Sequence, residues 1–318
     1  MKKNKKILDI FITHWNEAWE IGKDMFGILA LQRGINWDGI GVTIIHDGSD
    51  AFPEEYFSSC PFTVNQVCLP HGGVSAARNY AIDHSDAVWI KFCDFDDMFL
   101  EVYSILSIVY AIQNCTEFDM VWFPMIIDSK DTQFVSDTLT IFIHDKIFRT
   151  SFLNREHIRF NEDLTYSEDF AFTTMVEMIA GPNRIGKIQS NFPIYIYISR
   201  EGSVVNRPDF WLKNKSGLFD AHVYIEAEIR KRGHWNKANM MVARTLAECL
   251  YVINSAPEDV DIDALVNRMK EYYRTHKGCL SGLNEDEWNA VIFATNAQNH
   301  CDITIKDISE WMKGVDDE

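Results

Sequence analysis

Short apolar runs alternate with longer segments of helical periodicity through the first two thirds of the chain. The apolar runs that predict strands lie at residues 7–13, 41–46, 63–69, 87–93, 118–127 and 193–199, and the periodic segments that predict helices lie at 17–33, 75–84 and 99–113. Strands separated by helices favour β-α-β units and a largely parallel sheet. Beyond residue 208 the pattern is helical throughout, and we expect a domain boundary there.

The charge balance narrows the classes of function. The 318 residues include 47 Asp plus Glu against 30 Lys plus Arg, a net charge of −17. This acid excess argues against a protein that wraps nucleic acid or binds anionic membranes, because such proteins hold phosphates with clustered basic side chains. With 47% hydrophobic residues, the chain can build a substantial core.

The sequence also indicates where the protein works. No apolar run reaches the roughly 18 residues of a membrane span, and the basic start is not followed by an apolar signal region. The seven cysteines are widely spaced and contain no Cys-x-x-Cys pair, so they support neither a zinc cluster nor a disulfide framework. We therefore expect a cytoplasmic protein with reduced thiols and no membrane span.

Polar side chains follow three of the predicted strands. Thr13 ends the first strand, Asp47 follows the second, and Asp94-Phe95-Asp96-Asp97 follows the strand at 87–93. In open α/β sheets, ligands bind in the crevice beyond the carboxyl ends of the strands. We therefore expect these side chains to border a ligand site.

Asp94 and Asp96 are the sharpest candidates in this set. In extended backbone, residues i and i+2 point to the same side, so their carboxylates could face one divalent cation. Mg²⁺ and Mn²⁺ prefer such oxygen ligands and commonly bind substrate phosphates as well. A bare Asp-x-Asp is more often a solvated acidic loop that caps a helix, here one from Met98, but its position after an apolar strand favours the metal site.

The other candidates each allow a structural and a chemical interpretation. Glu168 and Asp169 precede an apolar helix, where a carboxylate either favours the helix N-terminus through its dipole or takes a proton from a hydroxyl group. Asp47 could bind a base or ribose, or simply form a turn with Gly48. Arg78 could meet a phosphate or a base, or pair with an acid on the surface.

Together, and in this order, these segments resemble the family 2 glycosyltransferases with the GT-A fold. The segments that carry the resemblance are Thr13-His14-Trp15-Asn16, Asp47-Gly48-Ser49, Gly72-Gly73-Val74-Ser75-Ala76-Ala77-Arg78-Asn79, Phe92-Cys93-Asp94-Phe95-Asp96-Asp97 and Glu168-Asp169-Phe170. The resemblance implies an α/β nucleotide-diphospho-sugar transferase fold, Rossmann-like with a mostly parallel central sheet, over residues 1–207. A helical appendage at 208–318 would follow it and frame the acceptor or mediate self-association into a homo-oligomer.

The resemblance also implies roles for single residues. The nucleotide of the donor would be bound by Thr13, Trp15, Asp47, Arg78 and Asp94. Asp96 would hold a Mn²⁺ or Mg²⁺ ion on the donor diphosphate, and Asp169 would be the catalytic base of an inverting enzyme. Arg200 and Ser203 would belong to a loop that closes over the donor phosphates.

The implied activity is the metal-dependent transfer of a hexosyl or N-acetylhexosaminyl group. The donor would be a nucleotide-diphosphate sugar, with a UDP-sugar favoured, and the acceptor a hydroxyl group of a glycan, a teichoic acid, a protein or a modified nucleobase. Two other functions stay open. A degenerate transferase could act as a binding or scaffold protein, and a haloacid dehalogenase-type phosphatase also uses an Asp-x-Asp, although near its first strand.

Four features depart from the family pattern. His46 replaces the first Asp of the usual Asp-Asp-Gly-Ser, and Trp15 stands where a Tyr is usual. Phe95 replaces a small residue between the two acids, and we expect it to reshape the sugar pocket. No His follows Tyr195 closely enough to serve as a third metal ligand.

Overall fold

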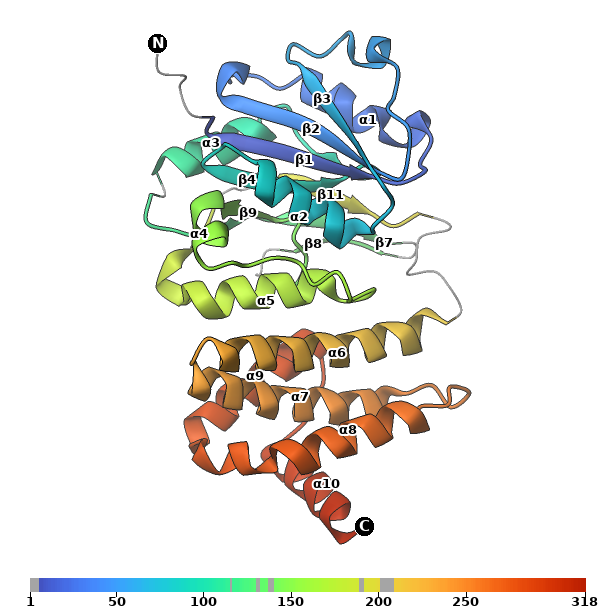
Figure 1. Ribbon diagram of the computed structural model, residues 1–318, viewed down its shortest axis with the longest axis vertical. Helices are drawn as coiled ribbons and strands as arrows, with labels where there is room; N and C mark the ends of the chain where they lie inside the picture. The colour runs from blue at the N-terminus through green and yellow to red at the C-terminus, as the bar shows by residue number, and fades with distance from the viewer. Residues whose placement is uncertain (1–5, 115, 130–131, 137–139, 189–191, 201–208) are drawn as a thin grey trace. The chain divides into compact units, whose positions relative to one another are not determined.

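The structure is a computed structural model that describes residues 6–114, 116–129, 132–136, 140–188, 192–200 and 209–318 (Figure 1). The chain divides into two compact units. The first comprises Met1–Asp163 and Glu168–Asn206, and the second comprises Leu164–Ser167 and Arg207–Glu318. The boundary predicted near residue 208, and Ser203, lie outside the described residues. Among the described residues, no helix is both long enough and apolar enough to span a bilayer.

The first unit is built on a seven-stranded sheet with the order β10-β6-β9-β4-β1-β2-β3. Its strands are β1 (Leu8–His14), β2 (Ile40–Asp47), β3 (Val64–Leu69), β4 (Trp89–Asp94), β6 (Met120–Trp122), β9 (Lys146–Arg149) and β10 (Ile185–Lys187). The pairs β1–β2, β1–β4, β2–β3 and β6–β10 are parallel, whereas β9 is antiparallel to both β4 and β6. The predicted mostly parallel α/β sheet is therefore confirmed.

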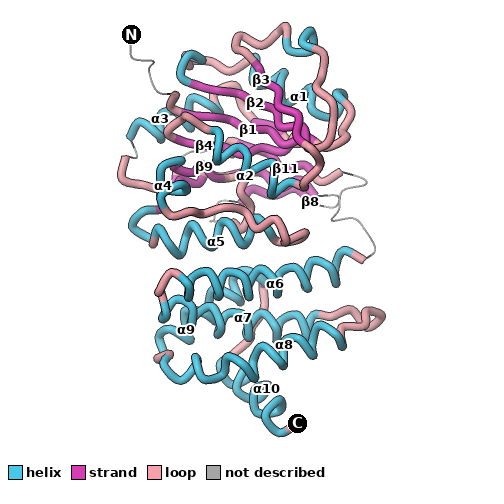
Figure 2. The backbone as a smooth tube through the Cα atoms, in the orientation of Figure 1, coloured by secondary structure: helices cyan, strands magenta, loops and turns pink. Residues whose placement is uncertain are grey.

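A smaller sheet has the order β5-β11-β7-β8. It contains β5 (Met98–Phe99), β7 (Met125–Ser129), β8 (Thr132–Ser136) and β11 (Tyr195–Ile198), and Figure 2 labels β8 and β11. The single strand predicted at 118–127 is wrong, because that segment divides into β6 and β7, which belong to different sheets. Pro124 lies between them and lacks the N–H that a continuous ladder needs.

Helices connect and cover the strands of the first unit. They are α1 (Trp19–Ala30), α2 (Val74–His84), α3 (Ser104–Asn114), α4 (Thr150–Arg155) and α5 (Glu168–Ala180), with 3-10 turns η1 (Trp37–Gly39), η2 (Glu54–Phe57) and η3 (Pro182–Arg184). The helix predicted from residue 99 begins only at Ser104, because Phe99 pairs with Tyr195 in the small sheet. The helix predicted at 17–33 is also shorter than expected.

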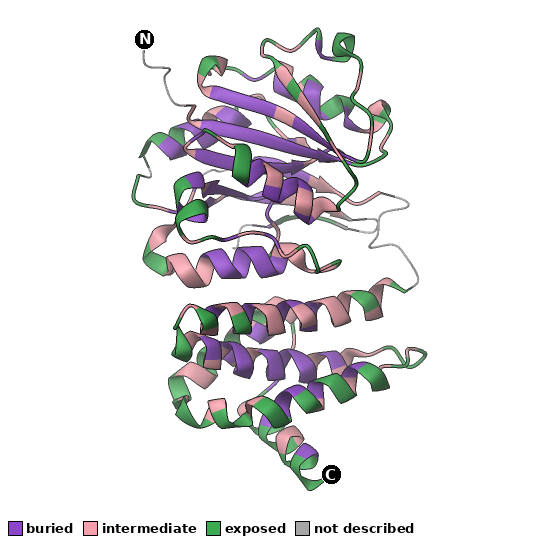
Figure 3. Ribbon diagram, viewed as in Figure 1, coloured by how far each residue is buried: buried purple, intermediate pink, exposed green. Residues whose placement is uncertain are grey.

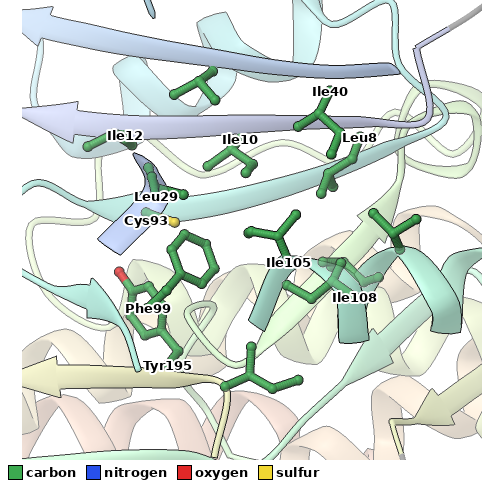
Figure 4. Close-up of a cluster of buried hydrophobic side chains, with 14 of the residues drawn as sticks. Leu8, Ile10, Ile12, Leu29, Ile40, Cys93, Phe99, Ile105, Ile108 and Tyr195 are labelled. Carbon is green, nitrogen blue, oxygen red and sulfur yellow. The ribbon is translucent and has the colours of Figure 1, made fainter. Parts of the chain in front are cut away.

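The core of the first unit lies against the central strands. All seven residues of β1 are buried, as expected for a parallel strand covered on both faces (Figure 3). Leu8, Ile10 and Ile12 of β1 pack in one cluster with Ile105 and Ile108 of α3 (Figure 4). This rigid centre fixes the strand ends, where the polar residues lie.

The second unit is helical, as the pattern beyond residue 208 predicts. It contains α6 (Phe210–Lys231), α7 (Trp235–Ser255), α8 (Asp263–His276), the 3-10 turn η5 (Lys277–Gly282), α9 (Glu285–Asn299) and α10 (Ile305–Asp317). The central helix is α7, which contacts α6, α8, α9 and α10. Capping boxes at Asn284 and Thr304 satisfy backbone N–H groups at the starts of α9 and α10.

Candidate active site

The carboxyl ends of β1 and β4 bring Thr13 and Asp94 together. The two strands are parallel, and their register pairs these two residues directly. The Thr13 hydroxyl donates a hydrogen bond of 2.8 Å to Asp94 Oδ1. The expected gathering of polar groups at this edge of the sheet is therefore confirmed for this pair.

Asp94 lies between two basic side chains. Its Oδ1 also accepts from Arg78 Nη2 at 3.2 Å, and its Oδ2 accepts from His144 Nε2 at 3.0 Å. Burial alone would raise the pKa of Asp94, but the charges of His144 and Arg78 outweigh burial and hold it far below its usual range. Asp94 is therefore a carboxylate at any physiological pH.

Arg78 connects Asp94 to the predicted catalytic base. It projects from α2, its side chain is only 2% exposed, and its Nη1 donates to Asp169 Oδ1 at 2.6 Å and Glu168 Oε1 at 3.2 Å. Both acids lie in the first turn of α5. Burial raises the pKa of Glu168, and the neighbouring charge of Asp169 raises it further. One buried guanidinium thus binds three carboxylates.

The chain turns after Asp94 instead of remaining extended. The Asp97 N–H donates to the Asp94 carbonyl at 3.2 Å, and β4 ends at Asp94. The expectation that extended backbone aligns Asp94 with Asp96 is therefore wrong. The group that the turn brings together consists of Asp94, Asp97 and His144, whose potential ligand atoms lie within 4.8 Å of one another.

Asp97 is a buried member of this group. It is 2% exposed and accepts hydrogen bonds from the Tyr195 hydroxyl at 3.1 Å and from the Ile198 N–H at 2.9 Å. Burial raises the pKa of Asp97, while the charge of His144 opposes that shift. Two carboxylates and an imidazole form a donor set that suits Mn²⁺. Asp94, Asp97 and His144 could therefore hold such an ion.

Asp96 lies at the more open side of the turn, with 31% of its side chain exposed. Burial, with the charges of Asp94 and Glu17, raises the pKa of Asp96 to about 6. Arg200 lies beside it: its Nη2 donates to the Asp96 carbonyl, and its Nε is 3.9 Å from Oδ2. Arg200 and Asp96 are thus neighbours.

Asp47 holds the loop ahead of α2. It is 4% exposed, and it accepts from the N–H groups of Gly72 at 2.7 Å and Gly73 at 3.0 Å and from His71 Nδ1 at 2.9 Å. Gly73 has a φ of +86°, a conformation that favours glycine. The Asp47 carboxylate therefore anchors a tight loop beside the site.

Trp15 lies on the same side of the site. Half of it is exposed, and its ring stacks on His71 with centroids 5.2 Å apart and planes 14° apart. An exposed aromatic face is suited to stacking on a nucleobase. Trp15 therefore stays a predicted base contact.

Phe95 does not line this site. It is 1% exposed and stacks on Phe52 at 5.1 Å, with its ring against Gly22 of α1. An effect of Phe95 on a sugar pocket stays a prediction, and it would have to act through this packing. The side chain is part of the core.

The sequence did not reveal His144. It comes from the segment before β9, where no periodic pattern marks a strand or helix. Lys146 Nζ holds this segment by donating to the Thr140 carbonyl at 2.7 Å and to Asp145 Oδ1 at 2.6 Å. Only the antiparallel insertion of β9 beside β4 brings His144 to Asp94.

Comparisons with known proteins find similarity in structure only. No protein-family model matches the chain, and no curated protein matches it in sequence. The crystal structure of Staphylococcus aureus TarS 1-349 matches with a TM-score of 0.65 and 17% identity, over 98% of this chain and 90% of that one. Its complex with UDP-GlcNAc gives the same values, and its complex with UDP gives a TM-score of 0.62 and 16% identity.

A longer TarS structure matches with a TM-score of 0.60 and 17% identity. The match covers 91% of this chain and 55% of the longer TarS chain. These structural neighbours are GT-A glycosyltransferases. At such low sequence identity, the likeness establishes a shared fold.

Proposed function

The chain has the GT-A fold, and on that premise we propose that it transfers a sugar from a nucleotide-diphosphate donor to a hydroxyl acceptor. One observation carries the proposal: Arg78 joins Asp94, at the end of β4, to Asp169, at the start of α5. The carboxylates that we assign to donor binding and to proton transfer thus share one site. A UDP-sugar is the favoured donor class, because TarS was solved with UDP and with UDP-GlcNAc.

The nucleotide would lie over the ends of β1 and β2. Trp15 would stack on the base, and Thr13 and Asp94, joined by their 2.8 Å hydrogen bond, would border the ribose. Asp47 would contribute to nucleotide binding by anchoring the loop that contains Gly72 and Gly73. Arg200, next to Asp96, would approach the diphosphate.

A divalent cation would lie near the turn that follows β4. Asp94, Asp97 and His144 offer oxygen and nitrogen ligands, and Asp96 stays a predicted ligand on the open side. Mn²⁺ fits a mixed carboxylate and imidazole set, and Mg²⁺ would rely on the carboxylates. Such an ion supplies positive charge that stabilises the leaving diphosphate.

Asp169 would serve as the general base. Its carboxylate would take the proton of the acceptor hydroxyl while that oxygen bonds to the anomeric carbon and the bond to the diphosphate breaks. Attack opposite the leaving group inverts the configuration. Arg78, 2.6 Å from Asp169, would orient this carboxylate.

Asp169→Asn tests the assignment. We expect turnover to fall by about 10²- to 10⁴-fold, the usual contribution of a general base, while UDP binding measured by calorimetry stays unchanged. Asp163→Asn, which changes an exposed acid, should keep full activity. Full turnover by Asp169→Asn would remove Asp169 from the mechanism.

A binding or scaffold function is the alternative, and it predicts nucleotide binding without turnover. A phosphatase would instead release phosphate from simple esters with no sugar nucleotide present. For the helical second unit, acceptor framing and self-association both stay proposals. Sedimentation equilibrium of the full chain separates them, since self-association predicts a mass above 36.8 kDa that depends on concentration.

A further inference from the structure

Two of the departures from the family pattern meet at a third residue. His46 and Phe95 both contact His14, the last residue of β1: the two His Nδ1 atoms are 2.9 Å apart, and the Phe95 ring centroid is 4.7 Å from that of His14. All three side chains are buried, with at most 4% exposed. The parallel register of β1 and β2 pairs His14 with His46 directly.

The hydrogen bonds at the outer ends of the pair fix two protons. His14 Nε2 lies 2.9 Å from the Glu17 carbonyl oxygen, which can only accept, so this nitrogen donates. His46 Nε2 lies 3.0 Å from Gln66 Oε1. The Phe52 N–H also donates to Gln66 Oε1, and Gln66 Nε2 donates to the Phe52 carbonyl, so the amide orientation is set and His46 Nε2 donates too.

A third proton is needed between the rings. The 2.9 Å contact of the two Nδ1 atoms is a hydrogen bond only if one of them carries a proton. Two neutral imidazoles carry one N–H each, whereas these contacts require three.

We propose that His14 and His46 form a buried imidazole–imidazolium pair that carries one positive charge and fixes the loop bearing Trp15 and the loop that follows Asp47 at the end of β2. The pair is a positioning element for the nucleotide site. Its effect on nucleotide binding rests on the proposed function, whereas its protonation does not.

The surroundings suit a charge on His14. The Glu17 carboxylate lies 3.7 Å from His14 Nε2, and the rings of Phe52 and Phe95 each lie 4.7 Å from the imidazole. Negative charge and aromatic π-systems both stabilise a cation. Burial lowers the pKa of His46, while its hydrogen bond to Gln66 and the charge of Asp50 oppose that shift.

The pair supports the loop that carries Trp15. The Glu17 carbonyl accepts from His14, and Glu17 Oε2 accepts from the Trp15 N–H at 2.7 Å. The Asn16 N–H donates to Ser49 Oγ at 2.8 Å, which ties this loop to the one after β2. Loss of the shared proton leaves two acceptors facing each other at one contact, so the loops loosen.

The charged state is complete below the pKa of the pair and is lost as pH rises through it. We therefore expect affinity for UDP with Mn²⁺, measured by calorimetry, to fall roughly tenfold across that transition, about the value of one hydrogen bond to a charged group. Asp96 and His144 also titrate near the site, so pH dependence of the wild type alone does not identify the pair.

Variants at His46 show whether the His14–His46 pair causes this pH dependence. The Asp Oδ and His Nδ1 atoms occupy similar positions, so His46→Asp keeps an acceptor for His14 and adds a negative charge. We expect this variant to bind UDP as wild type does, with its transition raised by about one to three pH units. His46→Leu removes the acceptor and should weaken UDP binding roughly tenfold below the transition. His234→Gln, at an exposed His, is the control and should change neither property.

Long-range ¹H–¹⁵N NMR of the imidazoles tests the protonation itself. At about pH 6 we expect both Nε2 atoms to be protonated and the two Nδ1 atoms to share one proton. Two neutral rings would overturn the inference, whatever UDP does. Equal UDP affinity in His46→Leu and wild type would overturn the positioning role. If the wild type binds no nucleotide at all, the proposed function fails while the NMR result still decides the charge of the pair.

Discussion

Replacing Arg78 by Met removes the buried cation that Asp94, Glu168 and Asp169 share. Met has a similar length and no charge, so it fills the space while leaving the three carboxylates without the guanidinium. In the native protein the guanidinium lies 3.2 Å from Asp94, 3.2 Å from Glu168 and 2.6 Å from Asp169, and Met can form none of these ion pairs. The like charges of the three acids then face one another in a poorly solvated site.

The size of the effect follows from burial. Removing one partner of a buried ion pair costs about 3–5 kcal/mol, because the remaining charge stays desolvated. Arg78 is 2% exposed and its carboxylates are 17–27% exposed, so we expect a loss in this range at about pH 8. At about pH 5 the loss should be smaller, because Glu168, whose pKa is already raised, takes up a proton and relieves the repulsion.

Urea unfolding, followed by the fluorescence of the nine tryptophans, measures this difference. Arg155→Met is the matched control, because Arg155 is 59% exposed and pairs with Glu156 at 2.7 Å, and it should cost less than about 1 kcal/mol. Arg78→Lys keeps the charge and should recover part of the loss. A loss in Arg78→Met no larger than that of the control at both pH values would refute the role of Arg78.

Three further predictions follow from the packing and charges of the first unit. Asp47→Ala leaves two backbone N–H donors without their acceptor and should lower the free energy of unfolding by about 1–3 kcal/mol in urea; no change would contradict the anchoring role. Gly22→Ala places a Cβ 2.3 Å from the Phe95 ring and should cost about 1–3 kcal/mol in thermal unfolding, whereas Gly27→Ala, with open space, should not destabilise. The pKa of Asp96 is raised from 3.8 to about 6, so its protonated form contributes stability that is present below pH 3.8 and lost as pH rises through about 6. Asp96→Asn should therefore flatten the pH profile of the free energy of unfolding in this range, and an unchanged slope would count against this.

The parallel core of the fold could be predicted because its strands are continuous apolar runs separated by helical periods. Every residue of β1 is buried, and a strand of this kind can be recognised from its run of apolar residues alone. The segment at 118–127 could not be resolved in this way, because β6 and β7 are one apolar run in the sequence. Their separation depends on Pro124 and on pairing with the distant strands β10 and β11.

The site, too, could be predicted from the sequence only in part. Thr13 and Asp94 could be placed together because parallel strands end at one edge, and Arg78 and Asp169 were candidates by their motifs. The turn after Asp94 makes Asp97 the partner of Asp94, and the insertion of β9 supplies His144. Neither a local turn geometry nor a contact across 50 residues leaves a periodic signal in the chain.

The most direct test of sugar transfer at this site is a screen of nucleotide-sugar hydrolysis read by mass spectrometry. The full chain is incubated with Mn²⁺ and each UDP- and GDP-sugar in turn, with Asp169→Asn in parallel. We expect a UDP-sugar to be cleaved to UDP and free sugar, and Asp169→Asn to cleave it about 10²- to 10⁴-fold more slowly. Cleavage of no donor, together with no binding of any nucleotide, would contradict the proposed function.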